Sequence, residues 1–474
     1  MSAPTQPDRI ETDSLGPVTL PADAYYGAQT ARGIANFPIS GIRISQFPHF
    51  LRALALVKMA AARANVRLGA LDANKGDVIC QVCEEIAAGR HHDAFPLDVF
   101  QGGAGTSTNM NINEVIANRG LEIMGRARGD YAALHPNNDV NLSQSTNDVY
   151  PTAIRLAILF SQEQLGDALE RLAAEFEAKS EDFANILKLG RTQLQDAVPM
   201  TLGQEFGAFA ITLREDVARL KEIVTLFHEV NLGGTAIGTG INTSADYQAA
   251  AIDELRQVTG LPVTAAGNLI EACWDTGAFV LFSGMLKRTA TKLSKICNDL
   301  RLLSSGPRGG LNEINLPALQ PGSSIMPGKV NPVVPEVVNQ VAYQVIGYDL
   351  TITLASEAGQ LQLNVMEPVI VYNTLHSLAL LTNAVETLRL RCVAGITANP
   401  ETCRRHLEAS TAVATALTPA IGYERAAELA KRVLTTGKTI REVLAEQDDL
   451  SEELIAQTLD LHVLVRPTPT RLAS

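Results

Sequence analysis

Positive charge is scarce in this chain of 474 residues, which carries a formal net charge of −12. No cluster of lysine and arginine and no basic amphipathic helix stands out along it. Nucleic acids and anionic membrane surfaces attract proteins through such clusters. The sequence therefore indicates neither as a partner, and an anionic small molecule would need a locally basic site.

Long apolar runs are absent as well. No stretch approaches the roughly 18 apolar residues of a membrane-spanning helix, and the start, MSAPTQPDRIETD, lacks the charged and then apolar layout of a signal peptide. We therefore expect a cytoplasmic protein. Residues 1 to about 10, which are polar and contain proline, and the tail from Arg466 are expected to be loosely ordered.

Cysteine is too sparse for a disulfide framework, with six residues spread over the chain. Cys80 and Cys83 form a CxxC, but no second pair or histidine pair accompanies it, and the surrounding ICQVCEEIAA has a helical pattern. Buried thiols are therefore predicted rather than a zinc site.

Strand-like alternation is scarce too, whereas apolar residues recur at spacings of three and four. Four segments carry this pattern: Ile158 to Phe176, Phe206 to Phe227, Leu286 to Leu300 and Val334 to Ile352. Such spacing predicts long helices that pack nearly parallel, and hence a mainly α-helical protein with an elongated bundle. From about Thr397 shorter helices suggest a small C-terminal domain.

Polar clusters stand at four junctions between a loop and a following segment. They contain Thr106 with Ser107 and Thr108, then Ser145 with Thr146 and Asn147, then Thr192 with Gln193, and finally GSSIMPGKVNP at Gly322 to Pro332. Each holds more hydroxyls and amides than one helix cap needs. We therefore expect the four clusters to form one divided site.

The last cluster combines two hydroxyls, Ser323 and Ser324, with a lone cation, Lys329, and an amide, Asn331. Its glycines and prolines predict a loop. The helix that follows is predicted to start at Pro332 with Asn331 as its cap. A helix N-terminus beside a lysine suits an anionic ligand, although plain turn and cap roles are the alternative.

GSSIMPGKVNP is similar to the signature of the class II fumarase and aspartase superfamily, and the resemblance runs from about Arg9 to about Gln447. Within it, GRTQLQDAVP, SQSTND, GLNEINLP and EAGQLQLNVMEPVI resemble the aspartases more than the fumarases. The resemblance implies a mainly α-helical subunit with three domains, at residues 1–143, 144–396 and 397–474. It also implies a homotetramer that is built on the long central helices, with active sites shared between three subunits.

The implied reaction is the reversible conversion of L-aspartate to fumarate and ammonia without an organic cofactor or resident metal, and divalent-metal activation stays open. The resemblance makes Ser323 the base that removes the Cβ proton through an enediolate intermediate. Fixed neutral donors suit this chemistry because a second negative charge develops on the β-carboxylate. The implied contacts are Thr106, Ser145, Thr146 and Ser324 to that carboxylate, Thr192, Lys329 and Asn331 to the α-carboxylate, and Asn147 and Gln193 to the amino group.

Gln193 stands where the fumarases resemble GRTH, and a glutamine cannot take up a proton near neutral pH. A hydration mechanism that needs imidazole to activate water would therefore be impaired. Fumarate hydratase is the alternative enzyme, and a non-catalytic helical scaffold is the alternative of another class. His135, in HPNNDVN, resembles a secondary anion-site position of fumarases. An ordinary surface histidine is the other interpretation.

Overall fold

The computed structural model describes residues 8–446 and Val465, so residues 1–7 and the tail from Arg466 lie outside the described residues. Arg9 and Ile10, expected to be loose, already belong to a strand. The chain is mainly helical, as predicted. It divides into two compact units, Met1–Gly166 with Arg219–Arg288 and Tyr343–Leu381, and Asp167–Ala218 with Thr289–Ala342 and Thr382–Ser474. The division into three domains stays a prediction.

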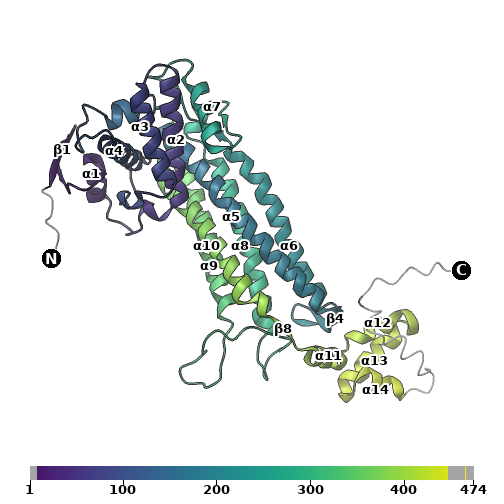
Figure 1. Ribbon diagram of the computed structural model, residues 1–474. Helices are drawn as coiled ribbons and strands as arrows, with labels where there is room; N and C mark the ends of the chain where they lie inside the picture. Colours follow the sequence, from purple (N-terminus) through teal and green to yellow (C-terminus); the bar gives the residue numbers. More distant parts are fainter. Residues whose placement is uncertain (1–7, 447–464, 466–474) are drawn as a thin grey trace. The chain divides into compact units, whose positions relative to one another are not determined.

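The first unit begins with an antiparallel hairpin, β1 (Arg9–Asp13) and β2 (Gly16–Leu20), in which Arg9 pairs with Leu20. Short helices follow, and α2 packs against both α3 and α7 (Figure 1). Cys83 is buried in α3 as predicted, whereas Cys80 is only half-buried, and both are free cysteines. The helices are α1 (Ala28–Asn36), α2 (Pro48–Arg67), α3 (Ala73–Ala87), α4 (Thr106–Ile123) and α7 (Tyr247–Thr259).

Five long helices contribute residues to both units: α5 (Thr146–Asp182), α6 (Leu202–Ile223), α8 (Gly277–Leu303), α9 (Val333–Glu357) and α10 (Glu367–Arg391). Of the apolar positions that predicted four of them, all are buried except Val341 and Tyr348, which are half-buried. The pattern did not single out α10, because residues on nearly every side of its first half are buried and no one stripe marks it.

Polar contacts tie these helices together within the second unit. The wholly buried carboxylate of Asp216 on α6 accepts hydrogen bonds from Thr289 Oγ1 (2.9 Å) and Lys292 Nζ (2.8 Å) on α8. Asn339 on α9 donates to Ser294 Oγ on α8 (2.8 Å). Neighbouring long helices therefore lie side by side in this unit, as the heptad-like spacing predicted.

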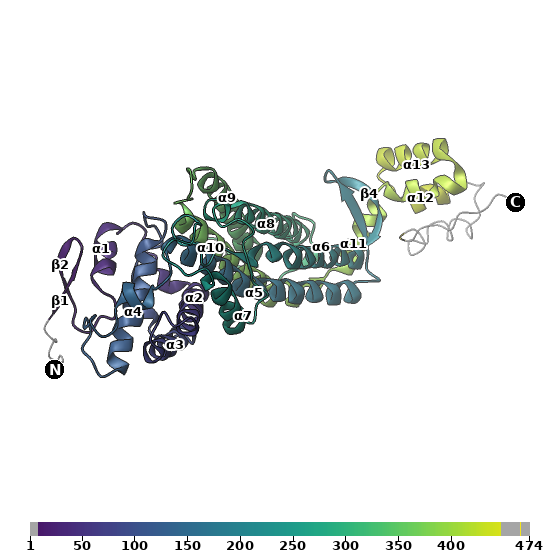
Figure 2. The ribbon, with the colours of Figure 1, turned by 90° about the horizontal axis from the view of Figure 1, so that it is seen from above.

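The second unit also contains the antiparallel hairpin β3 (Leu187–Thr192) and β4 (Gln195–Thr201), which packs against α11 and α12 (Figure 2). Leu189 enters a hydrophobic core to which each of the four helices described after residue 399 contributes. Ser410 Oγ donates to Asp196 Oδ2 (2.6 Å). The helices are α11 (Pro400–Ala409), α12 (Ala412–Ile421), α13 (Tyr423–Thr436) and α14 (Ile440–Ala445). The remaining strands form two short pairs, β5 (Glu229–Val230) with β6 (Thr264–Ala265) and β7 (Ile314–Asn315) with β8 (Thr397–Ala398).

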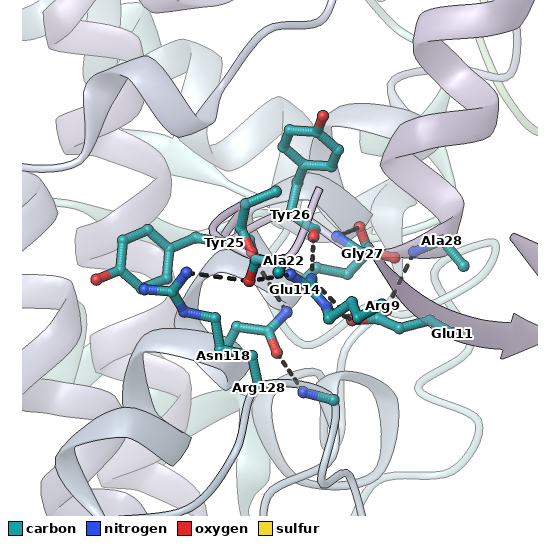
Figure 3. Close-up of polar contacts among 12 residues, drawn as sticks. Arg9, Glu11, Ala22, Tyr25, Tyr26, Gly27, Ala28, Glu114, Asn118 and Arg128 are labelled. Atoms are coloured by element: carbon teal, nitrogen blue, oxygen red, sulfur yellow. Dashed lines mark hydrogen bonds and ion pairs between the residues drawn. The ribbon is translucent and has the colours of Figure 1, made fainter. Parts of the chain in front are cut away.

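A buried carboxylate on α4 fixes the start of α1 (Figure 3). Glu114 accepts hydrogen bonds from the backbone N–H groups of Gly27 (2.8 Å), Gln29 (2.9 Å) and Thr30 (3.1 Å) and from Thr30 Oγ1 (2.6 Å). Glu11 accepts from Ala28 N (3.2 Å). Burial raises the pKa of Glu114, and the four donors oppose the rise. The otherwise unpaired N–H groups of a helix start are thus satisfied by side chains.

We expect Glu114→Ala to lower the free energy of unfolding by about 3–5 kcal/mol, because several buried donors lose their acceptor. Urea unfolding of the purified protein measures this. Glu122→Ala on the same helix is the matched control, since Glu122 is 42% exposed and its pairing with Arg119 should contribute less than about 1 kcal/mol. Equal losses in the two variants would contradict the anchoring role of Glu114.

Candidate active site

The first two polar clusters meet at the starts of α4 and α5, in the first unit. Asn109 Nδ2, one turn into α4, donates a hydrogen bond to Thr146 Oγ1, the first residue of α5 (3.2 Å). Gly105 precedes α4 with φ of 86°, and a Cβ there would lie 2.5 Å from the ring of Tyr150. Only glycine therefore allows the start of α4 to approach α5 this closely.

The hydroxyls of these clusters differ in exposure. Thr106 is exposed and its Oγ1 donates to Gly103 O (2.8 Å), while Thr146 is buried. Ser145 Oγ accepts from Asn147 N (3.2 Å), and Ser145 N donates to Asp148 Oδ1 (2.9 Å). This reciprocal pairing at the start of α5 has the form of a capping box and fixes the Ser145–Asn147 segment.

Asp148 extends this pairing to a second loop. The carboxylate is wholly buried, and its Oδ2 accepts from Gly233 N (3.0 Å) and Thr235 N (3.1 Å). Burial raises the pKa of Asp148, and the three backbone donors and the nearby Lys58 ammonium oppose the rise. Asp148 was not predicted from the sequence, although the spacing S-x-x-D from Ser145 is a helix-start signal that could have identified it.

The loop bound by Asp148 orients the amide of Asn147. Asn147 Nδ2 donates to Ala236 O (2.6 Å), so its Oδ1 faces away from that carbonyl as an acceptor. Thr235, between Gly234 and Ala236, has φ of 53° although it is β-branched, and its buried hydroxyl has no partner among the described residues. Backbone conformations of this kind cost about 1–3 kcal/mol and gather at functional sites.

His135 has a structural role in this arrangement. Its Nδ1 accepts from the N–H groups of Asn137 (3.0 Å) and Asn138 (3.2 Å), at the start of the single turn Pro136–Val140. The imidazole therefore serves as a cap. A secondary anion site at His135 stays a prediction.

The third cluster lies at the tip of the β3–β4 hairpin, in the second unit. Thr192 and Gln193 are exposed, and Gln193 and Leu194 have φ of 56° and 60°, the left-handed values of a two-residue type I′ turn. Below the tip, the fully buried Glu313 binds Lys188 Nζ (3.0 Å) and Arg191 Nη1 (2.7 Å) on β3. Although burial acts to raise it, these two cations hold the pKa of Glu313 below its usual range.

The fourth cluster is an irregular loop, as predicted, and its ends are tied together. Gly322 N donates to Lys329 O (2.7 Å), and Asn331 Nδ2 donates to Gly322 O (2.8 Å). Inside the loop, Ser323 Oγ accepts from Ile325 N (3.2 Å) and Met326 N (3.0 Å). Ser324 and Lys329 are exposed.

The predicted start of the following helix was wrong by one residue. Helix α9 begins at Val333, so Pro332 precedes it and is not its first helical residue. No backbone N–H group of α9 donates to Asn331 Oδ1 among the described contacts, and the amide nitrogen Nδ2 donates to Gly322 O. Helix boundaries vary by a residue or two between definitions, but the amide contact is distinct.

Among residues 8–446, no hydrogen bond or ion pair joins the hairpin tip to the Gly322–Pro332 loop. Within the first unit, Asn109, next to the first cluster, contacts Thr146 of the second cluster. That all four clusters form one site stays a prediction. No set of three or more His, Cys, Asp or Glu side chains among the described residues is arranged to hold a metal ion. Within the same part of the chain, no helix has the length and apolar character needed to span a bilayer.

The fold is mainly α-helical, with hydroxyls and amides at the starts of its long helices, and comparison with family models assigns it to the lyases. A family model described as Lyase matches residues 16–347, and one described as Fumarase C C-terminus matches residues 413–466. The chain therefore belongs to this lyase family, the class II fumarase and aspartase superfamily.

Three relatives illustrate the match. The aspartate ammonia-lyase of Pseudomonas aeruginosa is 57% identical over 466 residues, 98% of either chain. A crystal structure described as fumarate lyase:delta crystallin from Brucella melitensis bound to cobalt is 60% identical and superposes with a TM-score of 0.95 over 97% of this chain and 100% of that one. Class II fumarase from Schistosoma mansoni is 36% identical, with a TM-score of 0.91 over 97% and 99% of the two chains.

We expect Asp148→Asn to destabilise the protein by about 2–4 kcal/mol, because the new NH₂ group would face backbone N–H donors in a buried site. The shift in thermal unfolding measures this. Asp246→Asn is the matched control, since Asp246 likewise lies at a helix start but is exposed and its side chain makes no cap bond. Equal shifts in the two variants would show that Asp148 does not hold the α5 start.

Proposed function

We propose that the protein is an aspartate ammonia-lyase, a carbon–nitrogen lyase that converts L-aspartate reversibly to fumarate and ammonia. Relatives that are 52–57% identical over nearly the whole chain carry this name. The geometric observation that carries the proposal is the Ser323 hydroxyl oxygen, which accepts two backbone N–H groups inside the loop.

Ser323 is the proposed base. A serine hydroxyl is a weak base, and it becomes effective when its alkoxide is stabilised. The N–H groups of Ile325 and Met326, at 3.2 and 3.0 Å from Oγ, are placed to provide this stabilisation. The alkoxide removes the Cβ proton, the electron pair moves into the β-carboxylate to form the enediolate, and the C–N bond then breaks as ammonia leaves.

Neutral donors hold the developing charge in this proposal. Thr106, Ser145, Thr146 and Ser324 bind the β-carboxylate, and Thr192, Lys329 and Asn331 bind the α-carboxylate. Asn331 uses one N–H for Gly322 O and retains a second for the ligand. Preorganised donors of this kind stabilise a transition state more than they would in water, because they need no reorganisation as charge develops.

The leaving group lies beside Asn147 and Gln193 in this proposal. Asn147 Oδ1 is left as an acceptor by the bond from Nδ2 to Ala236 O, and an ammonium group donates to such an oxygen. Neither amide can act as a general acid or base near neutral pH. The site therefore suits an amine that leaves in protonated form better than a hydroxyl that must gain a proton to leave.

We propose that the active enzyme is a cytoplasmic homotetramer that uses no organic cofactor, and that three subunits complete each site. An apolar stripe on α9, formed by Tyr343 (59% exposed), Ile346 (37%), Leu350 (60%) and Leu354 (60%), is a surface that a second subunit would cover.

Ser323→Ala should abolish nearly all turnover while leaving the fold intact, because it removes the proposed base from a loop and creates no core cavity. Fumarate formation from L-aspartate, followed by its ultraviolet absorbance, measures the loss, and circular dichroism checks the fold. Ser324→Ala is the matched control, since it removes the neighbouring hydroxyl and should retain measurable turnover. A Ser323→Ala enzyme with near-normal kcat would rule out Ser323 as the base.

The substrate choice tests the function itself. Purified protein should release fumarate from L-aspartate and much less from L-malate, by roughly 10⁴ in kcat/KM where the wrong leaving group leaves polar groups unpaired. Equal rates on the two substrates would assign fumarate hydratase instead. An absence of turnover with both would favour a non-catalytic scaffold.

A further inference from the structure

We infer that Lys58, a buried residue of α2 that does not touch the substrate, sets the hydrogen-bond direction of Thr146 and so positions a donor of the site. This inference rests on the proposed function of the Ser145–Asn147 cluster. It adds a residue that neither the motifs nor the family roles include. The route runs from Lys58 through Asn141 and Asn109 to Thr146.

The first step is the contact of Lys58 with two amide oxygens. Lys58 is fully buried, and its Nζ donates to Asn141 Oδ1 and Gln144 Oε1, each at 2.9 Å. Burial lowers the pKa of Lys58 to about 7, against the attraction of Asp148. A neutral amine still has two N–H groups for these two oxygens, so the direction of both bonds holds on either side of that pKa.

Backbone contacts agree with this assignment of the amide nitrogens and oxygens. Gln144 Nε2 donates to the carbonyls of Val140 and Leu142, each at 3.0 Å. Asn141 Nδ2 donates to Gln144 O (3.2 Å). Carbonyl groups accept only, so the side-chain nitrogens must face them and the oxygens must face Lys58.

Asn109 links Asn141 to Thr146 of the proposed site through hydrogen bonds. Its Nδ2 lies 3.2 Å from Asn141 Oδ1 and 3.2 Å from Thr146 Oγ1. Because Asn141 presents an oxygen, Asn109 must present nitrogen, and Thr146 Oγ1 then accepts. No described residue accepts the proton of Thr146 itself, so this O–H is left to donate to a ligand carboxylate.

If the direction of these hydrogen bonds were reversed, the Thr146 hydroxyl could no longer donate to the ligand. If Asn141 turned its nitrogen toward Asn109, Asn109 would turn its oxygen toward Thr146, whose hydroxyl would then donate inward. Placing a lysine in the protein interior is unfavourable, because burial penalises its charged form. Lys58 thus favours one direction of hydrogen bonding along four side chains.

The test compares Lys58→Met and Lys58→Gln, two neutral replacements that differ in hydrogen-bond donors. Methionine donates none, whereas the glutamine NH₂ supplies two N–H groups for the same two oxygens. We expect Lys58→Met to lower kcat on L-aspartate by about 10- to 100-fold, the range seen when an outer group that orients a ligand is removed. Lys58→Gln should retain most of the turnover that methionine loses.

A double-mutant cycle with Thr146→Val separates the route from general damage. Thr146→Val alone should lower kcat by roughly 10²- to 10³-fold as the loss of one oxyanion donor. If Lys58 acts through Thr146, Lys58→Met added to Thr146→Val should cause no further fall in kcat. Losses that multiply in the double variant, or equal losses in the Met and Gln variants, would overturn the inference, as would normal kcat in Lys58→Met.

Lys75→Met is the matched control. Lys75 contacts the same loop region through Asp139 (2.8 Å) but lies outside the route, and its kcat should stay within about twofold of wild type. Wild-type turnover of L-aspartate reports on the proposed function alone. If the wild type used L-malate instead, the same cycle measured with L-malate would still test the route, because both substrates carry the β-carboxylate.

Discussion

The buried carboxylate of Asp148 is the interaction on which the arrangement of the site depends. Backbone N–H groups that solvent cannot reach must find an acceptor inside the protein. Asp148 accepts from three of them, one at the start of α5 and two in the loop that orients Asn147. Glu114 has the same relation to the start of α1, and Glu313 gathers cations beneath the hairpin tip. Buried carboxylates thus join segments that are far apart in the sequence.

The anions are therefore buried away from the ligand, and the proposed ligand-binding groups are neutral except for Lys329. A site of hydroxyls, amides and helix starts suits a reaction in which negative charge grows on a carboxylate that is already bound. More cations would bind the substrate and the intermediate alike and would gain little rate. Because the chain has a net charge of −12, the position of Lys329 matters more for binding an anionic substrate.

Much of the fold could be predicted from the sequence, because a helix that buries one face repeats its apolar residues every three or four positions. The helices α5, α6, α8 and α9 were found in this way. Helix α10 was not, since burial on nearly all sides leaves no stripe. The four polar clusters were identified by their composition. That they form one site was predicted and stays a prediction, whereas the contacts that hold single members in place, such as that from Asn109 to Thr146, were not predictable.

Single residues within the site were harder to predict for a physical reason. Asn331 was expected to cap α9, but the sequence does not reveal that the loop folds back so that its amide nitrogen donates to Gly322 O. Lys58 stands in an alanine-rich helix, where an isolated lysine is usually solvated. Lys58 follows Leu54 by four residues, and this spacing could have indicated that it lies on the buried side of the helix. Its partners come from a loop more than eighty residues later.

The β3–β4 hairpin has a consequence for the C-terminal helices. Its tip carries Thr192 and Gln193, while Leu189 of the same hairpin is part of their hydrophobic core and Asp196 is bound by Ser410. A ligand that orders the tip and a change that stabilises these helices therefore act on one shared element. By thermodynamic linkage the effect is mutual. If stable C-terminal helices strengthen ligand binding, the bound ligand stabilises these helices against local unfolding by the same free energy.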